Sequence, residues 1–345
     1  MTPRASLTPR ASLNPRASLN PRASLDPRAS RTPRPTRRAL LGGLLGAAAL
    51  PTLAACGGVT SLDGGSGGGG SGGGSSSGGL VVGTANFTEN QILGYLYAEA
   101  LRGAGVKASV RPNLGSREIV IPALQQGDID LLPEYQGNLL LHFDDTAKQT
   151  EAGDLQNALA VALPTALEAL PYAAAEDKDV FAVTKETADK HGLRSLADLH
   201  KLDGKLVFGG PAEDKKRVVG LVGLKEVYGT TFKEFKSLDA SGPLVKGALK
   251  KGDVDVANLF STDPDIQANG WIMLADPKQL IPAQHIVPVI RSAKADAKVR
   301  RALARLGGAL TTQELAKLNK LVDVEKKDPD DVAGDWAKRN GLTKG

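Results

Sequence analysis

One segment of the sequence recurs, and this recurrence constrains the fold more than any other feature. Residues 123–135 read ALQQGDIDLLPEY and residues 248–260 read ALKKGDVDVANLF, so Ala-Leu, Gly-Asp and a second Asp repeat at a constant offset of 125 residues. In both copies an apolar-faced helix is expected to end at the Gly, which accepts the left-handed turn that closes many helices. A short strand and an aromatic residue follow. The repeat predicts two similar α/β lobes, although a common Gly-Asp-Ile/Val-Asp turn could also occur twice by chance.

The repeat also predicts where a ligand would bind. We expect strands at 129–132 and 254–259, followed by the aromatic residues Tyr135 and Phe260. Ligands of open α/β sheets lie beyond the carboxyl ends of the strands. Tyr135 and Phe260 are therefore expected to face each other across a cleft, one from each lobe, as parts of an aromatic cage. The alternative is that Tyr135 is an ordinary core residue.

The first 55 residues differ from the rest of the chain. Residues 2–37 repeat a six-residue unit of the type TPRASL, and because every unit has a Pro and an Arg and little to bury, we expect disorder. Arg37 and Arg38 precede an apolar run at 40–50, which is too short to span a bilayer and is typical of a signal peptide. The paired Arg residues resemble a twin-arginine export signal, but a Sec signal also begins with basic residues.

The single Cys of the chain follows this apolar run. The sequence LAAC, which ends at Cys56, resembles a bacterial lipobox and implies cleavage before Cys56 and lipidation of its thiol; the alternative is a chance free Cys. Residues 64–79 are only Gly and Ser, a composition typical of a flexible tether. Residues 56–79 are thus expected to anchor the mature protein on the extracytoplasmic face of the cell membrane.

The formal net charge of +5 originates in the leader. Nine of the 43 Lys and Arg residues, but only one of the 38 Asp and Glu residues, lie in residues 1–55, which leaves 34 basic and 37 acidic residues in the other 290. The body therefore has no basic surplus for binding nucleic acid. One Cys and four His in no ligand spacing argue against a metal site, and no cofactor is expected.

Polar residues lie at a strand–helix junction near the start of the body. A strand is expected at 80–82, and Thr88 is expected to cap the next helix together with Gln91 in a capping box. The junction formed by Asn86, Phe87 and Thr88 either binds a ligand anion through helix N–H groups or is ordinary helix capping.

Two arginines and one polar loop are further candidates. Arg117 is expected to be a solvated residue of a first helical turn rather than an anion contact. Arg217 either reaches a carboxylate or belongs to a solvated basic run at 215–217. Ser261 and Thr262 are polar groups at the tip of the second repeated strand.

The chain is expected to cross between the lobes twice, at strands near 180–184 and 286–290. Lobe I would then comprise residues 80–180 and 287–345, and lobe II residues 181–286.

Four separated segments resemble one known family. They are GTANFTE at 83–89, NLGSR at 113–117, GDIDLLPEYQGN at 127–138 and LFSTDP at 259–264. They resemble the glycine betaine, choline and carnitine substrate-binding proteins of osmoprotectant ABC transporters, the OpuAC-like family. The resemblance implies an α/β, type II periplasmic-binding-protein fold with two lobes. It also implies that a monomer captures a quaternary-ammonium osmoprotectant between the lobes and delivers it to permease subunits that a separate ATPase drives.

The motif positions and the candidates above define the expected ligand site: Asn86, Phe87, Thr88, Tyr135, Asn138, Arg217, Phe260, Ser261 and Thr262. The chain also departs from the family pattern. Family members commonly have a Lys in place of Ala85, a Thr in place of Asn138 and several Tyr residues in the cage, one of them at the position of either Phe260 or Leu259. These departures favour the low-affinity branch of the family, or a different ligand.

Three other functions fit less of the sequence. The chain could be a receptor for another small metabolite, or a binding protein that docks on a membrane sensor. An exported enzyme fits least, because the nearest match to the Gly-x-Ser-x-Gly motif of a hydrolase lies in the Gly/Ser tether. No catalytic residue is expected.

Overall fold

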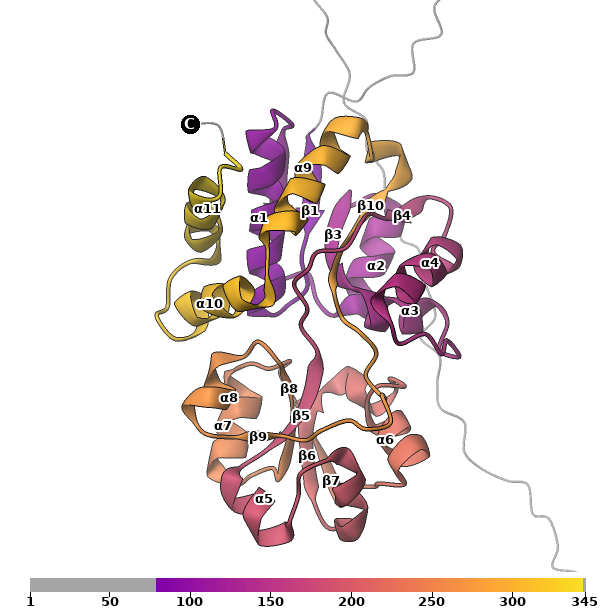
Figure 1. Cartoon of the computed structure of the whole chain (residues 1–345), viewed down its shortest axis with the longest axis vertical. Helices are drawn as coiled ribbons and strands as arrows, with labels where there is room; N and C mark the ends of the chain where they lie inside the picture. The colour runs from indigo at the N-terminus through magenta and orange to yellow at the C-terminus, as the bar shows by residue number, and fades with distance from the viewer. Residues whose placement is uncertain (1–78, 344–345) are drawn as a thin grey trace, which may run out of the picture. The chain divides into compact units, whose positions relative to one another are not determined.

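The computed structural model describes residues 79–343, which form two five-stranded sheets flanked by helices (Figure 1). The strands are β1 (Leu80–Gly83), β2 (Ala108–Arg111), β3 (Leu131–Tyr135), β4 (Leu167–Ala169), β5 (Asp179–Val183), β6 (Val207–Pro211), β7 (Glu234–Leu238), β8 (Val256–Phe260), β9 (Ile272–Met273) and β10 (Ile286–Arg291). The α-helices are α1 (Thr88–Gly103), α2 (Arg117–Gln126), α3 (Gln136–Phe143), α4 (Ala152–Ala162), α5 (Lys185–His191), α6 (Leu221–Tyr228), α7 (Pro243–Lys251), α8 (Pro264–Ala268), α9 (Ala297–Ala309), α10 (Thr312–Asp323) and α11 (Pro329–Arg339). The leader, Cys56 and the tether lie outside the described residues.

The two sheets have the same arrangement of parallel and antiparallel strands. The sheet of lobe I has the order β2-β1-β3-β10-β4, in which β1 is parallel to β2 and β3, and β10 is antiparallel to β3 and β4. The sheet of lobe II has the order β7-β6-β8-β5-β9, in which β6 is parallel to β7 and β8, and β5 is antiparallel to β8 and β9. Each sheet therefore combines three parallel strands with an antiparallel strand that lies beside the third of them, as the predicted two-lobed α/β fold requires.

The repeated segment forms the same helix–turn–strand unit in both lobes. Helices α2 and α7 end at Gln126 and Lys251, and the next residues, Gly127 and Gly252, have φ angles of 85° and 75°. Strands β3 and β8 then span 131–135 and 256–260, so the helix ends and both strand boundaries keep the offset of 125 residues. Both strands begin two residues later than the sequence predicted.

The second Asp of each copy explains the later start. The N–H of Asp130 donates to the Val81 carbonyl at 2.7 Å, and its Oδ2 accepts from the Val81 N–H at 3.0 Å. Asp255 makes the same two contacts with Val207, both at 2.8 Å. Because each Asp is held on both sides against the preceding strand, regular pairing begins only at the next residue. This shared geometry rules out a chance recurrence of a turn.

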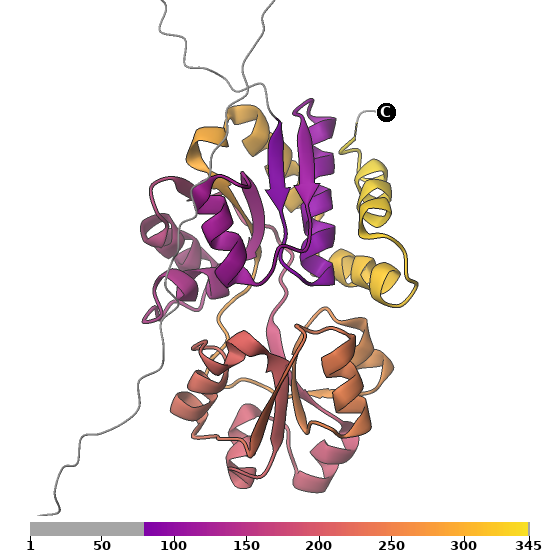
Figure 2. The ribbon, with the colours of Figure 1, turned by 180° about the vertical axis from the view of Figure 1, so that it is seen from behind.

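Two adjacent segments join the lobes. The Ala173 N–H donates to the Ile286 carbonyl at 2.8 Å, and the Asp177 N–H donates to the Gln284 carbonyl at 3.2 Å. Strand β5 itself lies in the sheet of lobe II and β10 in the sheet of lobe I, as the view from behind also shows (Figure 2). The crossings therefore lie just before the two strands to which the sequence assigned them.

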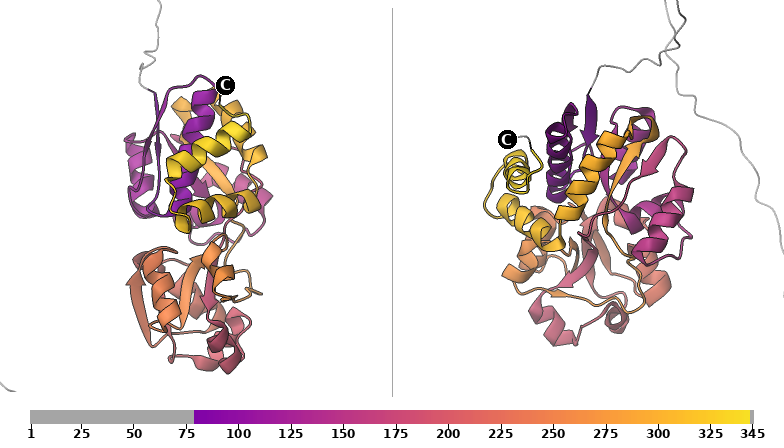
Figure 3. Two further views of the ribbon diagram at one scale, coloured as in Figure 1. Left: turned by 90° about the vertical axis from the view of Figure 1, so that its left-hand side faces the viewer. Right: turned by 45° about the horizontal axis from the view of Figure 1, so that its top comes forward.

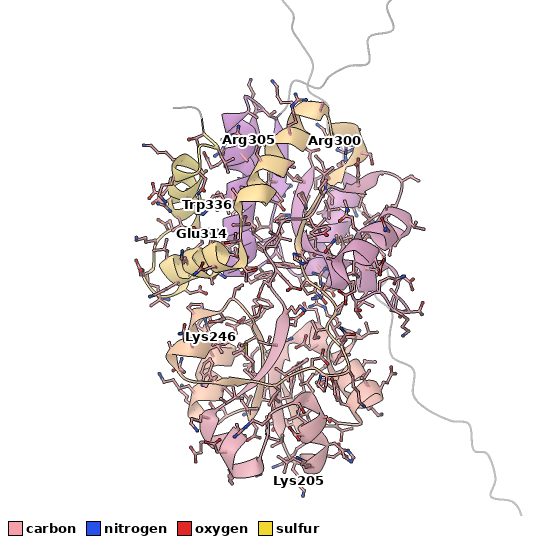
Figure 4. All side chains as sticks on the ribbon, in the orientation of Figure 1. Lys205, Lys246, Arg300, Arg305, Glu314 and Trp336 are labelled. Carbon is pink, nitrogen blue, oxygen red and sulfur yellow. The ribbon has the colours of Figure 1, made fainter. Side chains whose placement is uncertain are left out.

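Apolar clusters cover both faces of each sheet, which is why the central strands are almost fully buried. On one face of lobe I, the helices α9, α10 and α11 pack around α1 (Figure 3). The buried Trp336 of α11 donates from its indole N–H to the Glu314 carboxylate of α10 at 3.1 Å (Figure 4). Within residues 79–343, no helix combines the length and apolar character needed to cross a bilayer.

Candidate functional site

A cavity of about 210 Å³ lies between the lobes, at the carboxyl ends of β3 and β8. Its wall includes the loop after β1, the start of α2, the end of β3, the crossing segment before β5 and the loops after β6 and β7. The sequence placed the binding cleft at this edge of the two sheets. Six of the nine expected site residues line the cavity, namely Asn86, Phe87, Tyr135, Asn138, Arg217 and Phe260.

Three aromatic rings form part of this wall. The Phe87 ring centroid is 6.1 Å from that of Tyr135 and 4.9 Å from that of Phe260. The sequence predicted that Tyr135 and Phe260 face each other across the cleft; both line the cavity, and Phe87, from the loop after β1, contacts both rings. The Tyr135 hydroxyl donates to the Glu89 carboxyl at 2.8 Å, which fixes the ring at the end of β3. Lobe I thus supplies two rings and lobe II the third.

Arg117 was expected to be solvated, and this prediction is wrong. Its side chain is 10% exposed, and its Nε and Nη2 donate to the Glu134 carboxylate at 2.7 to 3.0 Å. Burial acts to lower the pKa of Arg117, but the charge and hydrogen bonds of Glu134 outweigh burial and raise it. Both side chains line the cavity. A weak signal for this pair was present in the sequence, because each of the two residues lies within a family motif.

Arg217 reaches a carboxylate of the protein itself. Its Nε and Nη2 donate to Glu118 of α2 at 3.1 to 3.2 Å, so this ion pair joins lobe II to lobe I. The Arg217 side chain is 24% exposed and also lines the cavity. It therefore does not belong to the solvated part of the basic run, which Lys215 and Lys216 form on the exposed surface.

Asn138 forms a second polar contact between the lobes. Its Nδ2 donates to the Asp179 carboxylate of β5 at 2.6 Å. The Gln284 side chain donates to Asn138 Oδ1 at 2.8 Å and accepts from the Asn138 backbone N–H at 3.0 Å. This pair of contacts fixes the amide so that its N–H groups point to Asp179.

Thr88 does not line the cavity and does not cap its helix. Helix α1 begins at Thr88 itself, Phe87 occupies the N-cap position, and no side chain accepts a capping hydrogen bond there. The Thr88 hydroxyl instead donates to Asp323 of α10 at 2.7 Å. The capping-box prediction with Gln91 is therefore wrong.

Ser261 and Thr262 also lie outside the cavity wall. The Ser261 hydroxyl donates to Asp177 at 2.9 Å, and the buried Thr262 hydroxyl donates to Glu89 of α1 at 2.5 Å. Because they follow β8 of lobe II, both residues tie that lobe to the crossing segment and to lobe I. Their position at a strand tip was predicted correctly, but their partners are protein carboxyl groups.

The buried carboxyl groups of Glu89 and Asp177 belong to one hydrogen-bonded network. Asn319 of α10 donates to Glu89 at 2.7 Å, in addition to the bonds from Tyr135 and Thr262. Burial raises the pKa of Glu89, and the hydrogen bonds that it accepts offset this rise only in part. Burial and then the charge of Glu89 raise the pKa of Asp177 well above its usual range. Two adjacent buried carboxyl groups cannot both ionise without a large cost, so the raised pKa values favour the retention of a proton by this pair.

One more buried carboxyl group, that of Asp214, is hydrogen-bonded to a residue of the cavity wall. Asp214, after β6, is 2% exposed, and burial followed by the charge of Asp179 raises its pKa to about 7. Asn258 of β8, which lines the cavity, donates to Asp214 at 3.0 Å. No sequence pattern indicated the roles of Asp177, Asp179 and Asp214, because their partners come from distant segments.

Comparison with known proteins connects this geometry to one family. The domain described as "Substrate binding domain of ABC-type glycine betaine transport system" (OpuAC) matches residues 78–339. The chain is 27% identical over 277 residues to the glycine betaine-binding protein YehZ of Escherichia coli, covering 76% of this chain and 91% of that protein. It is also 27% identical over 277 residues to the carnitine transport binding protein OpuCC of Listeria monocytogenes, covering 76% and 87%.

A solved structure agrees with these relatives. The crystal structure of a glycine betaine/carnitine/choline ABC transporter protein superposes with a TM-score of 0.60 at 25% identity, covering 76% of this chain and 99% of the other. The two-lobed type II periplasmic-binding-protein fold is therefore confirmed. From its matched domain and this fold, the chain belongs to the OpuAC family of ABC-transporter substrate-binding proteins.

Proposed function

We propose that this protein captures a quaternary-ammonium osmoprotectant, such as glycine betaine, choline or a related compound, in the cavity between its lobes. The observation that carries the proposal is the aromatic wall made by Phe87, Tyr135 and Phe260, to which both lobes contribute. A quaternary ammonium group has no N–H to donate, so it is held by aromatic faces and by nearby negative charge. A cavity of about 210 Å³ is small, and it suits a compact ligand of this kind.

The contacts between the lobes support a role in delivery. The ion pair of Arg217 with Glu118 and the hydrogen bond of Thr262 with Glu89 each join one lobe to the other. Hinge closure on a ligand forms such contacts, and their loss releases the ligand. We infer that the ligand-bound form docks on the permease subunits of an importer whose separate ATPase drives uptake.

Export and anchoring complete the proposal. The leader would direct export, and lipidated Cys56 would hold the mature protein on the extracytoplasmic face of the cell membrane. Residues 64–79 would tether the binding domain to this anchor. The protein would act as a monomer. We propose no enzymatic activity, since the relatives are solute-binding proteins of transporters. Fractionation of cells that express Cys56→Ala tests the anchor: the variant should leave the membrane fraction, and its retention there would contradict lipidation.

Isothermal titration of the full chain with glycine betaine, choline, carnitine and proline betaine tests the ligand class. We expect saturable binding of at least one of them, weakened about threefold to thirtyfold by Phe87→Ala, because one cation–π contact contributes about 0.5–2 kcal/mol. Folded protein that binds none of the four would refute the quaternary-ammonium assignment. The chain would then be a receptor for another metabolite, or a sensor-docking protein.

A further inference from the structure

Among the described residues, the cavity wall has acidic side chains without an ion pair, whereas its basic side chains are all paired. The wall contains two cationic side chains, and each already has a carboxylate partner: Arg117 pairs with Glu134 and Arg217 pairs with Glu118. Neither guanidinium group is an uncompensated positive charge. A ligand carboxylate would therefore have to displace or share a protein carboxylate in order to form a strong ion pair.

The acidic side chains of the wall are different. Four of them form no ion pair with any residue in the described range 79–343, namely Asp177, Asp179, Glu213 and Asp239. Asp177 shares the proton of the buried network, and Asp239 accepts from the first N–H groups of α7 at 2.9 Å. Even without Asp177, three carboxylates of the described wall remain outside any ion pair, and the charge of Asp179 also acts on Arg117, whose guanidinium group is already paired with Glu134.

Asp179 has the clearest relation to the aromatic wall. It is the first residue of β5 and lies directly opposite Phe260, the last residue of β8, in the antiparallel register of the two strands. Its carboxylate accepts from Asn138, whose amide is fixed by Gln284, so it presents negative charge rather than a donor. A cation held by the rings would share the cavity with this carboxylate, because Asp179 and the three aromatic residues line the same wall.

We propose that the cavity selects a quaternary-ammonium ligand of net positive charge over a zwitterionic betaine, and that Asp179 is the main selectivity residue. This inference rests on the proposed function, and it narrows the ligand to the choline-like class. Opposite charges attract strongly inside a cavity that excludes water, and a ligand carboxylate among unpaired acidic groups is repelled. The same negative charge therefore favours the cation and disfavours the zwitterion.

The test is a titration of the full chain with ligands that differ mainly in charge. Choline carries one positive charge, glycine betaine adds a carboxylate, and 3,3-dimethylbutan-1-ol has the shape of choline without the charge. We expect choline to bind at least about tenfold more tightly than glycine betaine, and the neutral alcohol to bind more weakly than both. Equal or tighter binding of glycine betaine would overturn the inference but leave the proposed function intact. Absence of choline binding would overturn the inference, and the proposed function would fall as well only if glycine betaine, carnitine and proline betaine also do not bind.

Variants separate a local effect of Asp179 from a change of net charge. In Asp179→Asn, the preference for choline over glycine betaine should fall to about threefold or less. Glu226→Gln removes the same charge from the exposed surface of α6, and it should leave the preference unchanged. If Asp179→Asn does not fold, Glu213→Gln removes another unpaired acid of the wall and should reduce the preference in the same direction. An unchanged preference in a folded wall variant would exclude charge selection by these acids.

Discussion

The hydroxyl group of Thr262 in lobe II donates a 2.5 Å hydrogen bond to the carboxyl group of Glu89 in lobe I, and both residues are buried. The bond joins the end of β8 to the first turn of α1, immediately behind the aromatic wall. The end of β8 and the first turn of α1 therefore take part both in ligand binding at the rings and in the contact between the lobes.

Thr262→Val keeps the shape of the side chain and removes this hydrogen bond. We expect ligand affinity to fall about fivefold to thirtyfold, since a hydrogen bond to a carboxyl group contributes about 1–2 kcal/mol and this one joins the two lobes. Titration calorimetry with choline measures the change. Thr165→Val, at an exposed position, is the matched control. Equal affinities of the two variants would show that the bond plays no part in closure.

Stability should decrease as pH rises, because burial raises the pKa values of Glu89 and Asp177 in the folded protein. A raised carboxyl pKa means that the folded state keeps its proton after the unfolded chain has lost it. The stabilisation is therefore complete below about pH 4 and is lost as the pH rises through the folded-state values. The melting temperature of Asp177→Asn should depend less on pH than that of the exposed control Asp253→Asn. Parallel profiles would contradict a shared buried proton.

Asp214 should make a separate contribution to the dependence of stability on pH. Because its pKa is raised to about 7, its contribution should be lost between about pH 4 and pH 7. Asp214→Asn should remove that part of the slope while leaving the slope above pH 7 unchanged. Circular dichroism melting at several pH values checks this expectation, and a slope that is unchanged below pH 7 would contradict it.

The ion pair of Arg217 with Glu118 should affect binding more than stability. Its side chains are 24% and 41% exposed, so its contribution to stability is expected to be below about 1 kcal/mol. Glu118→Gln should leave the melting temperature nearly unchanged and speed ligand release several-fold, measured by stopped-flow. The double exchange Arg217→Glu with Glu118→Arg should restore slow release. If release stays fast in the double variant, Arg217 binds the ligand itself rather than acting through Glu118.

Gly127→Ala and Gly252→Ala compare the two copies of the repeat. Both positions have left-handed φ angles, so each substitution should cost about 1 kcal/mol of unfolding free energy. A Cβ at Gly127 would lie 3.0 Å from the Arg291 guanidinium group, whereas a Cβ at Gly252 meets nothing within 4 Å. Gly127→Ala should therefore be the more destabilising substitution in urea denaturation, and the reverse order would contradict this account.

The sequence predicted most of the architecture but only part of the site. The repeat was sufficient for two lobes and for the location of the cleft, because Gly127 and Gly252 mark the same local turn. It could not predict the burial of Arg117, which depends on the packing of α2 against β3, the strand that contains Glu134. Local patterns describe neighbours along the chain, whereas most polar groups of this cavity meet partners from other elements.

The antiparallel strands β5 and β10 have a consequence for the order of folding. The sheet of lobe II contains only residues from 179 to 273, so it can be complete while the C-terminal part of the chain is still being synthesised. The sheet of lobe I lacks the strand between β3 and β4 until residues 286–291 exist. The lobe that begins first along the chain is therefore the one that is finished last, after the other lobe is in place.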